Sequence, residues 1–236
     1  MKYLDTDTGM LDADGAEDAV SSTIKLEQLI DAAQRQIDAL PENHNAAEKA
    51  ELELKIAGSL VDLKRNAEAW DVARAAFDIF MAAADYEQAA VACDIMFNTE
   101  EDGALSALGQ GIWLSVTFPV DTELSVALLQ HVVDETPDDS DGGALAATIA
   151  HYIVDLRAEP GRKRDDLLFF TNNLLATVAR RHSEIEGQDQ FDAWFEKLEL
   201  KDPAKFLPRM RNVVDVLVQD DWWFDREKLQ ESLPVN

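Results

Sequence analysis

The sequence predicts an all-α fold: an array of antiparallel helical hairpins with a smaller, aromatic-rich helical subdomain at the C-terminal end. Alanine, leucine, aspartate and glutamate dominate, whereas glycine (10) and proline (7) are scarce among the 236 residues. Apolar residues recur every three or four positions, and no segment alternates between apolar and polar residues over the length of a strand. Because 47% of the residues are hydrophobic, the chain can bury a substantial core. We therefore expect about ten helices joined by short turns.

The N-terminal part opens with an acidic, glycine-containing segment, residues 1–20, which shows no apolar periodicity and is predicted to be disordered. The first helix is expected over residues 24–40, after hydroxyl side chains at residues 21–23 that can cap it and before Pro41. A second helix is expected over residues 46–64, with its large apolar side chains on one stripe.

The next two helices carry the most specific pattern in the chain. The third is expected from about residue 67 to a turn at Ala84 and Asp85, and the fourth over residues 86–97. Their packing faces combine small and large residues, namely Ala73, Ala76, Phe77, Phe80, Ala89, Cys93 and Met96. Alanines let paired helices approach closely, and aromatic rings fill the groove opposite.

This pattern resembles the tetratricopeptide repeat over about residues 53–98. Ala57, Gly58 and Val61 form a weaker copy upstream, and Trp70 departs from the repeat, which has a small residue near that position. The resemblance implies a helical scaffold that binds peptides or partner proteins and performs no chemistry.

The middle of the chain is predicted to form three apolar helices. Pro119 stops the first, and Asp121 or Thr122 caps the second. Gly109 and Gly111 lie inside the first, where we interpret them as the mark of a close helix crossing and not of a nucleotide-binding loop. A loop rich in turn residues precedes the third helix. These helices are expected over about residues 103–118, 122–135 and 144–157.

The C-terminal part begins after a long helix at residues 165–186, which ends a helical-repeat-like domain spanning residues 21–186. Residues 187–236 are predicted to form a helical subdomain or cap, because basic residues return there and aromatic residues are dense. Trp222 and Trp223 either cover the core or anchor a partner, and their place directly after an apolar helix favours the core. Short helices are expected at about 189–198, 203–219 and 225–232.

Charge is distributed unevenly. The chain has 21 basic and 47 acidic side chains, a net charge of −26, which disfavours binding to nucleic acid or to anionic lipid. Residues 101–156 carry ten acidic side chains and no lysine or arginine, so this stretch is either mostly buried or an acidic and apolar binding face. We expect a protein partner with a basic or apolar face.

The sequence contains no recognisable motif for catalysis, metal binding or nucleotide binding. Cys93 lies in an apolar helical pattern, where a thiol is buried and inert. The four histidines do not fall at metal-ligand spacing, and the acidic stretches at 11–15 and 137–142 lack the ligand positions of an EF-hand. We therefore expect no cofactor, no metal and no enzymatic activity.

These observations favour a soluble, cytoplasmic, non-catalytic protein that acts as a protein–protein interaction scaffold, adaptor or assembly factor. The N-terminal residues lack the apolar stretch of a signal peptide. Two alternatives remain, an acidic DNA mimic that inhibits a nucleic-acid-binding protein and a permanent subunit of a larger complex, a metalloenzyme included. The predicted partner-binding residues are Asp134, Glu135, Asp138, Asp139, Asp141, Trp113, Trp222 and Trp223.

Overall fold

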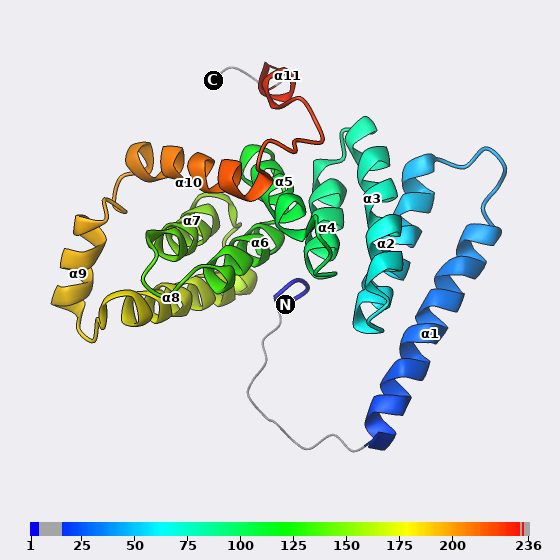
Figure 1. Ribbon diagram of the computed structural model, residues 1–236, viewed down its shortest axis with the longest axis horizontal. Helices are drawn as coiled ribbons and strands as arrows, with labels where there is room; N and C mark the ends of the chain where they lie inside the picture. Colours follow the sequence, from blue (N-terminus) through cyan, green and yellow to red (C-terminus); the bar gives the residue numbers. More distant parts are fainter. Residues whose placement is uncertain (5–15, 232, 234–236) are drawn as a thin grey trace.

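The computed structural model describes residues 1–4, 16–231 and 233 of the chain. In this part of the chain it contains eleven α-helices and no strand, which confirms the predicted all-α array of helical hairpins (Figure 1). The helices are α1 (Ala16–Asp38), α2 (Ala46–Asp62), α3 (Asn66–Ala82), α4 (Tyr86–Phe97), α5 (Ala104–Thr117), α6 (Thr122–Glu135), α7 (Asp141–Arg157), α8 (Arg162–Ser183), α9 (Gln188–Lys197), α10 (Pro203–Val218) and α11 (Arg226–Glu231).

Helices that follow one another in the sequence pack against each other from α1 to α8. Figure 1 shows α2, α3 and α4 side by side on one side of the molecule and α6, α7 and α8 on the other, with α5 between the two groups. Helix α10 then returns to pack on α5 and α7, which lie far from it in the sequence. Helix α5 therefore occupies the centre of the fold.

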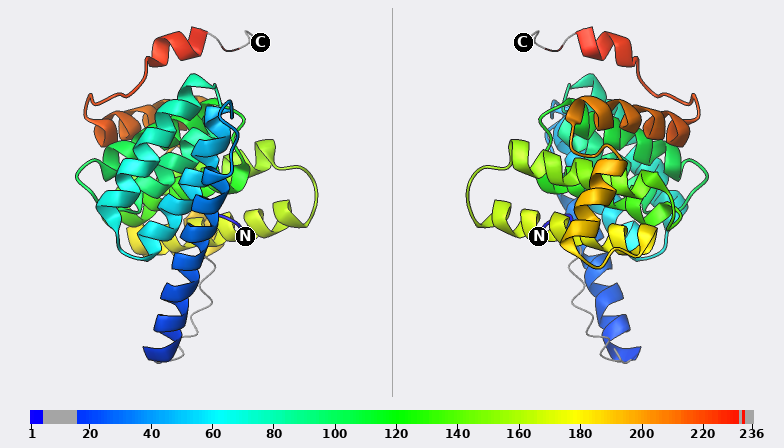
Figure 2. Two further views of the ribbon diagram at one scale, coloured as in Figure 1. Left: turned by 90° about the vertical axis from the view of Figure 1, so that its right-hand side faces the viewer. Right: turned by 90° about the vertical axis from the view of Figure 1, so that its left-hand side faces the viewer.

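Helix α1 lies at the outer edge of the array and has α2 as its main neighbour. Its N-terminal end projects beyond the other helices (Figures 1 and 2). The helix begins at Ala16, inside the segment predicted to be disordered, and Leu4 in the same segment is only 4% exposed. The rest of that segment, residues 5–15, lies outside the described residues.

The start of α7 shows how side-chain caps set helix boundaries. The Ser140 hydroxyl accepts a hydrogen bond from the Gly142 amide (3.2 Å), so the helix begins at Asp141, three residues earlier than predicted. At α6 the Asp121 carboxylate accepts from the amides of Glu123 (2.8 Å) and Leu124 (3.4 Å), which confirms Asp121 as the cap. Local side-chain chemistry therefore determines both boundaries.

The turns that join α2 to α3 and α3 to α4 have the same geometry. Lys64 and Ala84 each adopt the left-handed conformation, with φ values of 59° and 56°. The next amide, of Arg65 or Asp85, donates to the carbonyl five residues before it, at 2.9 Å in both turns. This repeated turn places α2, α3 and α4 in a regular row.

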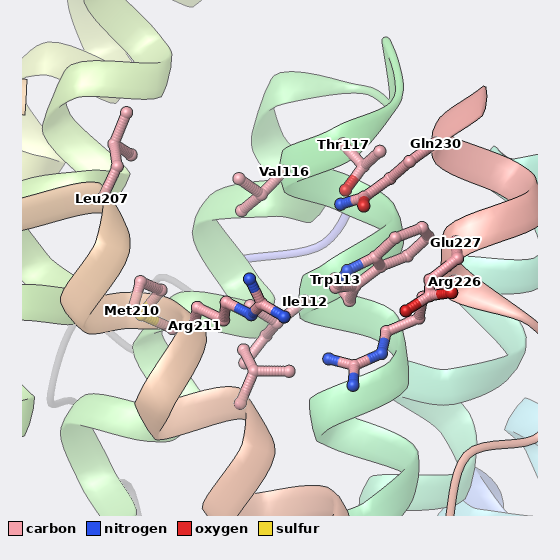
Figure 3. A pocket seen from close by; sticks show the side chains of 11 residues that line it. Ile112, Trp113, Val116, Thr117, Leu207, Met210, Arg211, Arg226, Glu227 and Gln230 are labelled. Atoms are coloured by element: carbon pink, nitrogen blue, oxygen red, sulfur yellow. The ribbon is translucent and has the colours of Figure 1, made fainter. Parts of the chain in front are cut away.

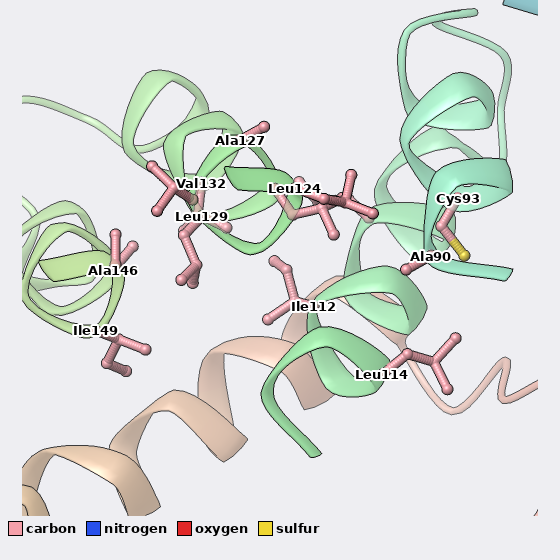
Figure 4. Packing of buried hydrophobic residues seen from close by; sticks show 14 of the residues in the cluster. Ala90, Cys93, Ile112, Leu114, Leu124, Ala127, Leu129, Val132, Ala146 and Ile149 are labelled. Atoms are coloured by element: carbon pink, nitrogen blue, oxygen red, sulfur yellow. The ribbon is translucent and has the colours of Figure 1, made fainter. Parts of the chain in front are cut away.

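One hydrophobic core extends through α2–α10 and also includes Leu4. Figure 4 shows the part of this core where residues of α4, α5, α6 and α7 meet. Most residues of α5, α6 and α7 are buried, so the cation-free stretch 101–156 lies mainly inside the protein. A Cβ atom at Gly111 would lie 2.8 Å from the Cβ of Cys93, and one at Gly109 would lie 2.6 Å from Val218. Both glycines therefore permit close helix crossings, as predicted.

The packing faces of α3 and α4 are buried at all seven positions singled out in the sequence, from Ala73 to Met96. Trp70, which departs from the repeat pattern, is half-buried and lies over Gly103 at the start of α5. The tetratricopeptide resemblance itself stays a prediction, since these contacts describe a helical hairpin of any family.

The C-terminal helices share the core of the preceding helices. Trp194 of α9 and Phe206, Met210, Val214 and Val218 of α10 belong to the same buried cluster as the residues of α5–α7. None of the helices in the described part of the chain combines the length and the apolarity that crossing a membrane requires.

Candidate functional site

The candidate site is a groove of about 240 Å³ between α5, α10 and α11, which we call the α5–α10–α11 groove (Figure 3). Its apolar floor comes from α5 and α10, and its polar rim comes mainly from the side chains of α11 and of Arg211. Such a lining suits an apolar group held by a few polar contacts at its edge. The floor and the rim consist of Ile112, Trp113, Val116, Thr117, Leu207, Met210, Arg211, Val214, Arg226, Glu227 and Gln230.

Trp113 is the one predicted partner-binding residue that lines this groove, and it is 9% exposed. Its ring makes edge or tilted contacts with Phe118 (6.0 Å between centroids), Trp222 (6.3 Å) and Phe224 (5.2 Å). These neighbours fix the indole, so the wall that it contributes is rigid.

Arginine side chains on the rim share one carboxylate. Arg226 donates to Asp215 (2.7 Å), and its guanidinium lies 3.8 Å from the centroid of Trp222. Arg211 approaches the other oxygen of Asp215 at 4.0 Å. Asp215 therefore offsets much of the positive charge at the groove.

The C-terminal aromatic residues pack on the chain's own helices. Trp223 makes edge contacts with Phe77 (5.2 Å) and Trp70 (6.2 Å), and the guanidinium of Arg74 lies 4.4 Å from its centroid. Trp222 and Trp223 are both half-buried, so part of each ring faces solvent. The segment thus covers the surface of α3 and α5, as the sequence favoured.

A fully buried glutamine anchors this segment. The Gln110 side chain donates to the carbonyl of Asp221 (2.8 Å) and accepts from the amide of Trp223 (3.3 Å). Because both polar ends of a buried amide are satisfied by backbone, Gln110 determines where the aromatic segment lies on α5.

The five predicted acidic residues lie at the end of α6, in the following loop and at the start of α7, and all five are exposed. Asp141 is paired within the chain, with His182 (3.2 Å) and with Arg209 (3.4 Å). Asp138 is 3.8 Å from Arg181. Partial desolvation raises the pKa of Asp134, although His131 and Arg181 lie near it. The structure therefore places Asp134, Glu135 and Asp139 on an acidic corner that lies outside the groove.

The cations missing from residues 101–156 come from the C-terminal third of the chain. Lys163 pairs with Asp121 (2.9 Å) and approaches Glu123 (3.6 Å), and Arg164 pairs with Asp155 (2.6 Å). With Asp138 and Asp141, five of the ten acidic side chains in this stretch have such partners. Half of the acidic side chains in this stretch thus have a neighbouring basic side chain in three dimensions.

Arg157 has a different role, because it caps a helix end. Its guanidinium donates to the carbonyls of Ser115 (2.6 Å), Val116 (2.6 Å) and Phe118 (3.1 Å) at the C-terminal end of α5. Burial lowers its pKa from the usual value.

Neither Cys93 nor the His182 cluster is arranged as a catalytic nucleophile. Burial raises the pKa of Cys93 well above its usual value, so the thiol stays protonated. Nδ1 of His182 lies 2.6 Å from the Ser183 hydroxyl, and Nε2 lies 3.2 Å from Asp141, an order that suggests a nucleophilic triad. The Trp194 indole N–H, however, donates a hydrogen bond to the same Nδ1 atom (3.1 Å), so the lone pair of this nitrogen is already used. This series of hydrogen bonds links α7, α8 and α9.

Among the described residues, no group of three or more His, Cys, Asp or Glu side chains is arranged to hold a metal ion. His131 instead bonds Asp94 (2.9 Å) and stacks near Phe97, and His151 bonds Thr171 (3.0 Å). These two histidines connect neighbouring helices.

Sequence analysis missed the α10 and α11 side of the groove. Phe206, Met210, Val214 and Val218 recur every four residues on α10, and this stripe, set against the glycines of α5, was the available signal. The pattern does not say which helix the stripe meets, so the groove could not be placed from it.

Comparisons of this chain with protein-family models, with curated proteins and with solved structures find no match. The candidate site is therefore defined by the contacts of this chain alone.

Proposed function

We propose that the protein is a non-catalytic interaction module, a scaffold, adaptor or assembly factor, that binds a partner protein through the α5–α10–α11 groove. The partner contributes one large apolar side chain, which enters the groove and contacts Trp113, Ile112 and Met210. The observation that carries this proposal is the groove itself, an apolar floor with a fixed aromatic wall and a polar rim.

Charge supports a partner whose apolar anchor is flanked by basic residues. Residues 220–231, which include α11, carry exposed carboxylates, and the net charge of the protein is −26. Electrostatic steering would speed the encounter and make it weaker at high salt. The exposed carboxylates of this segment are Asp220, Asp221, Asp225, Glu227 and Glu231, of which Glu227 lines the groove.

The two alternatives stay predictions. A DNA mimic requires a ridge of unpaired carboxylates, and the pairing of five of the ten in residues 101–156 with chain cations does not favour it. The permanent-subunit alternative places the interface on residues 101–156, most of which are buried within this chain.

The test compares two variants with the same chemical change. Val116→Glu places a carboxylate on the half-buried floor of the groove, whereas Val216→Glu places it on α10 at a side chain that is 71% exposed. The tagged wild type and both variants are recovered from the native host at low salt, after circular dichroism has shown that each is folded.

We expect the wild type and Val216→Glu to retain a stoichiometric partner that Val116→Glu loses by about tenfold or more. A photo-crosslinking residue at position 117 should couple to that same partner. Equal recovery with Val116→Glu would place the partner elsewhere, and recovery of every protein alone at low salt would contradict the proposal.

A further inference from the structure

Residues 1–4 lie against the body of the protein, beside α6, although eleven residues (5–15) separate them from α1 (Figure 1). Leu4 is 4% exposed and belongs to the hydrophobic core, and Tyr3 is half-buried against it. The connecting residues contain four aspartates and two glycines, and the sequence predicts no regular structure for them. The segment is thus docked on the fold at a long distance along the chain.

Glu123 of α6 holds the segment through its backbone. Its Oε1 atom accepts from the amide of Tyr3 (2.7 Å) and from the amide of Leu4 (3.3 Å), and its Oε2 atom lies 3.6 Å from Nζ of Lys163. The Glu123 residue is only 2% exposed. A buried carboxylate needs hydrogen-bond donors, and here two consecutive backbone amides of a bent segment supply them. Any short peptide that adopts the same bend, and has no proline at these two positions, carries the same donors.

Charge at this place favours a basic residue in the position of Lys2. The hydrogen bond to the Tyr3 hydroxyl (2.6 Å) raises the pKa of Lys2, and the nearby carboxylates of Glu87 and Asp121 raise it further. The site therefore fits a short sequence pattern: a basic residue, an aromatic residue and a leucine. Acidic side chains surround the basic residue, the leucine is buried, and the amides of the aromatic residue and the leucine bond Glu123.

We propose that the surface around Glu123, which we call the Glu123 site, is a binding site for a short bent peptide of this pattern, and that residues 1–4 occupy it in cis until the corresponding segment of a partner protein displaces them. One carboxylate oxygen accepts both peptide amides and one leucine side chain fills the apolar part, so the same contacts are available to another chain. This inference goes beyond the proposed function, because the Glu123 site lies on α6 and shares no residue with the α5–α10–α11 groove.

The first experiment frees the Glu123 site and offers it a defined ligand. Leu4→Asp in the full chain disfavours docking of the resident segment and leaves Glu123 intact. The probe is a fluorescent, N-acetylated peptide with the sequence of residues 1–8, and its control carries N-methyl groups on the amides of its tyrosine and leucine. Binding is followed by fluorescence anisotropy, with circular dichroism as the check on folding.

We expect Leu4→Asp to bind the probe at least about tenfold more tightly than the wild type, because the resident segment no longer competes. The N-methylated peptide should not bind, and adding Glu123→Ala to Leu4→Asp should abolish binding of the probe. Folded Leu4→Asp that fails to bind, or that binds both peptides equally, would overturn the proposal.

The second experiment uses the wild type and so does not depend on how any variant folds. The measurement is amide hydrogen exchange, in which the amides of a displaceable segment should exchange when the segment detaches locally. The amides of Tyr3 and Leu4 should then exchange at least about a hundredfold faster than the amide of Leu128 in the core. If the Leu4 amide exchanged as slowly as that of Leu128, residues 1–4 would be a fixed part of the fold and the Glu123 site would not be open to a partner segment.

Discussion

Helices α1 and α5 use their apolar residues in opposite ways. In α1, Ala33 is the only buried residue among the side chains that the structure describes, and Ile24 and Leu29 are 49% and 59% exposed. In α5, ten of fourteen residues are buried, including Gln110 and Ser115. Helix α1 has one main neighbour, whereas α5 is enclosed by α4, α6 and α10. Burial therefore follows from the number of neighbours that the fold supplies, and an apolar side chain alone does not ensure it.

The largest expected effect compares one leucine from each environment. Leu128 of α6, which is fully buried against Gly111 of α5, should lose about 2–5 kcal/mol of unfolding free energy on mutation to alanine, because a cavity remains. Leu29→Ala on α1 should change the unfolding free energy by less than about 0.5 kcal/mol. Urea denaturation measures both, and similar values would show that α1 is packed more closely than its exposure indicates.

Mutation of a glycine to alanine should change the unfolding free energy with opposite signs in α5 and in α2. A Cβ atom at Gly111 meets the Cβ of Cys93 at 2.8 Å, so Gly111→Ala should destabilise the protein by about 1–3 kcal/mol. Gly58 on α2 has no atom within 4 Å of the new Cβ, so Gly58→Ala should stabilise by about 0.5–1 kcal/mol. Thermal unfolding of the pair tests this, and a stabilising Gly111→Ala would mean that α4 and α5 can move apart freely.

The arginine that caps α5 should matter more than one at the end of α1. Arg157→Ala removes the donor for three carbonyls and should cost about 2 kcal/mol of unfolding free energy. Arg35→Ala, in the exposed last turn of α1, should change it by less than about 0.5 kcal/mol. Equal effects in urea denaturation would contradict the role of Arg157 as a cap.

The smallest effect concerns pH. Burial lowers the pKa of His151 below its usual 6.5, outweighing the charge of Asp155, and Arg164 lowers it further. Below pH 6.5 the unfolded chain therefore binds a proton that the folded chain does not bind, and stability falls as the pH falls. His151→Gln should lose less unfolding free energy than the wild type between pH 7 and pH 5, and an identical pH profile would show that His151 does not contribute.

Local features of the fold could be predicted from the sequence. The bounds of α4 agree with the prediction, and Asp121 caps α6, because a helix end depends on residues within one turn. The predicted start of α7, at residue 144, is three residues too late. The Gly142–Gly143 pair suggested a loop, whereas the Ser140 cap starts a helix there. Local propensity was outweighed there by a single side-chain hydrogen bond.

Long-range features of the candidate site could not be predicted. Trp113 was selected as an aromatic residue in an apolar helix, but nothing near it in the sequence indicates that Met210 and Arg226 lie opposite. No cation lies near the predicted acidic residues in the sequence, but in the fold Arg209 of α10 and His182 of α8 both contact Asp141. These contacts depend on how the helices are arranged, which helical periodicity does not specify.

The position of α10 on α5 also has a consequence for the order of events during translation. Helix α5 is complete at Thr117, but α10, which covers Gly109, begins only at Pro203. At ordinary ribosomal speeds of about 5–20 residues per second, the nascent chain exposes this apolar helix for roughly 4–20 s before its cover is synthesised. During that interval the face of α5 that α10 covers is open to chaperones or to aggregation, so burial of this face waits for the synthesis of α10.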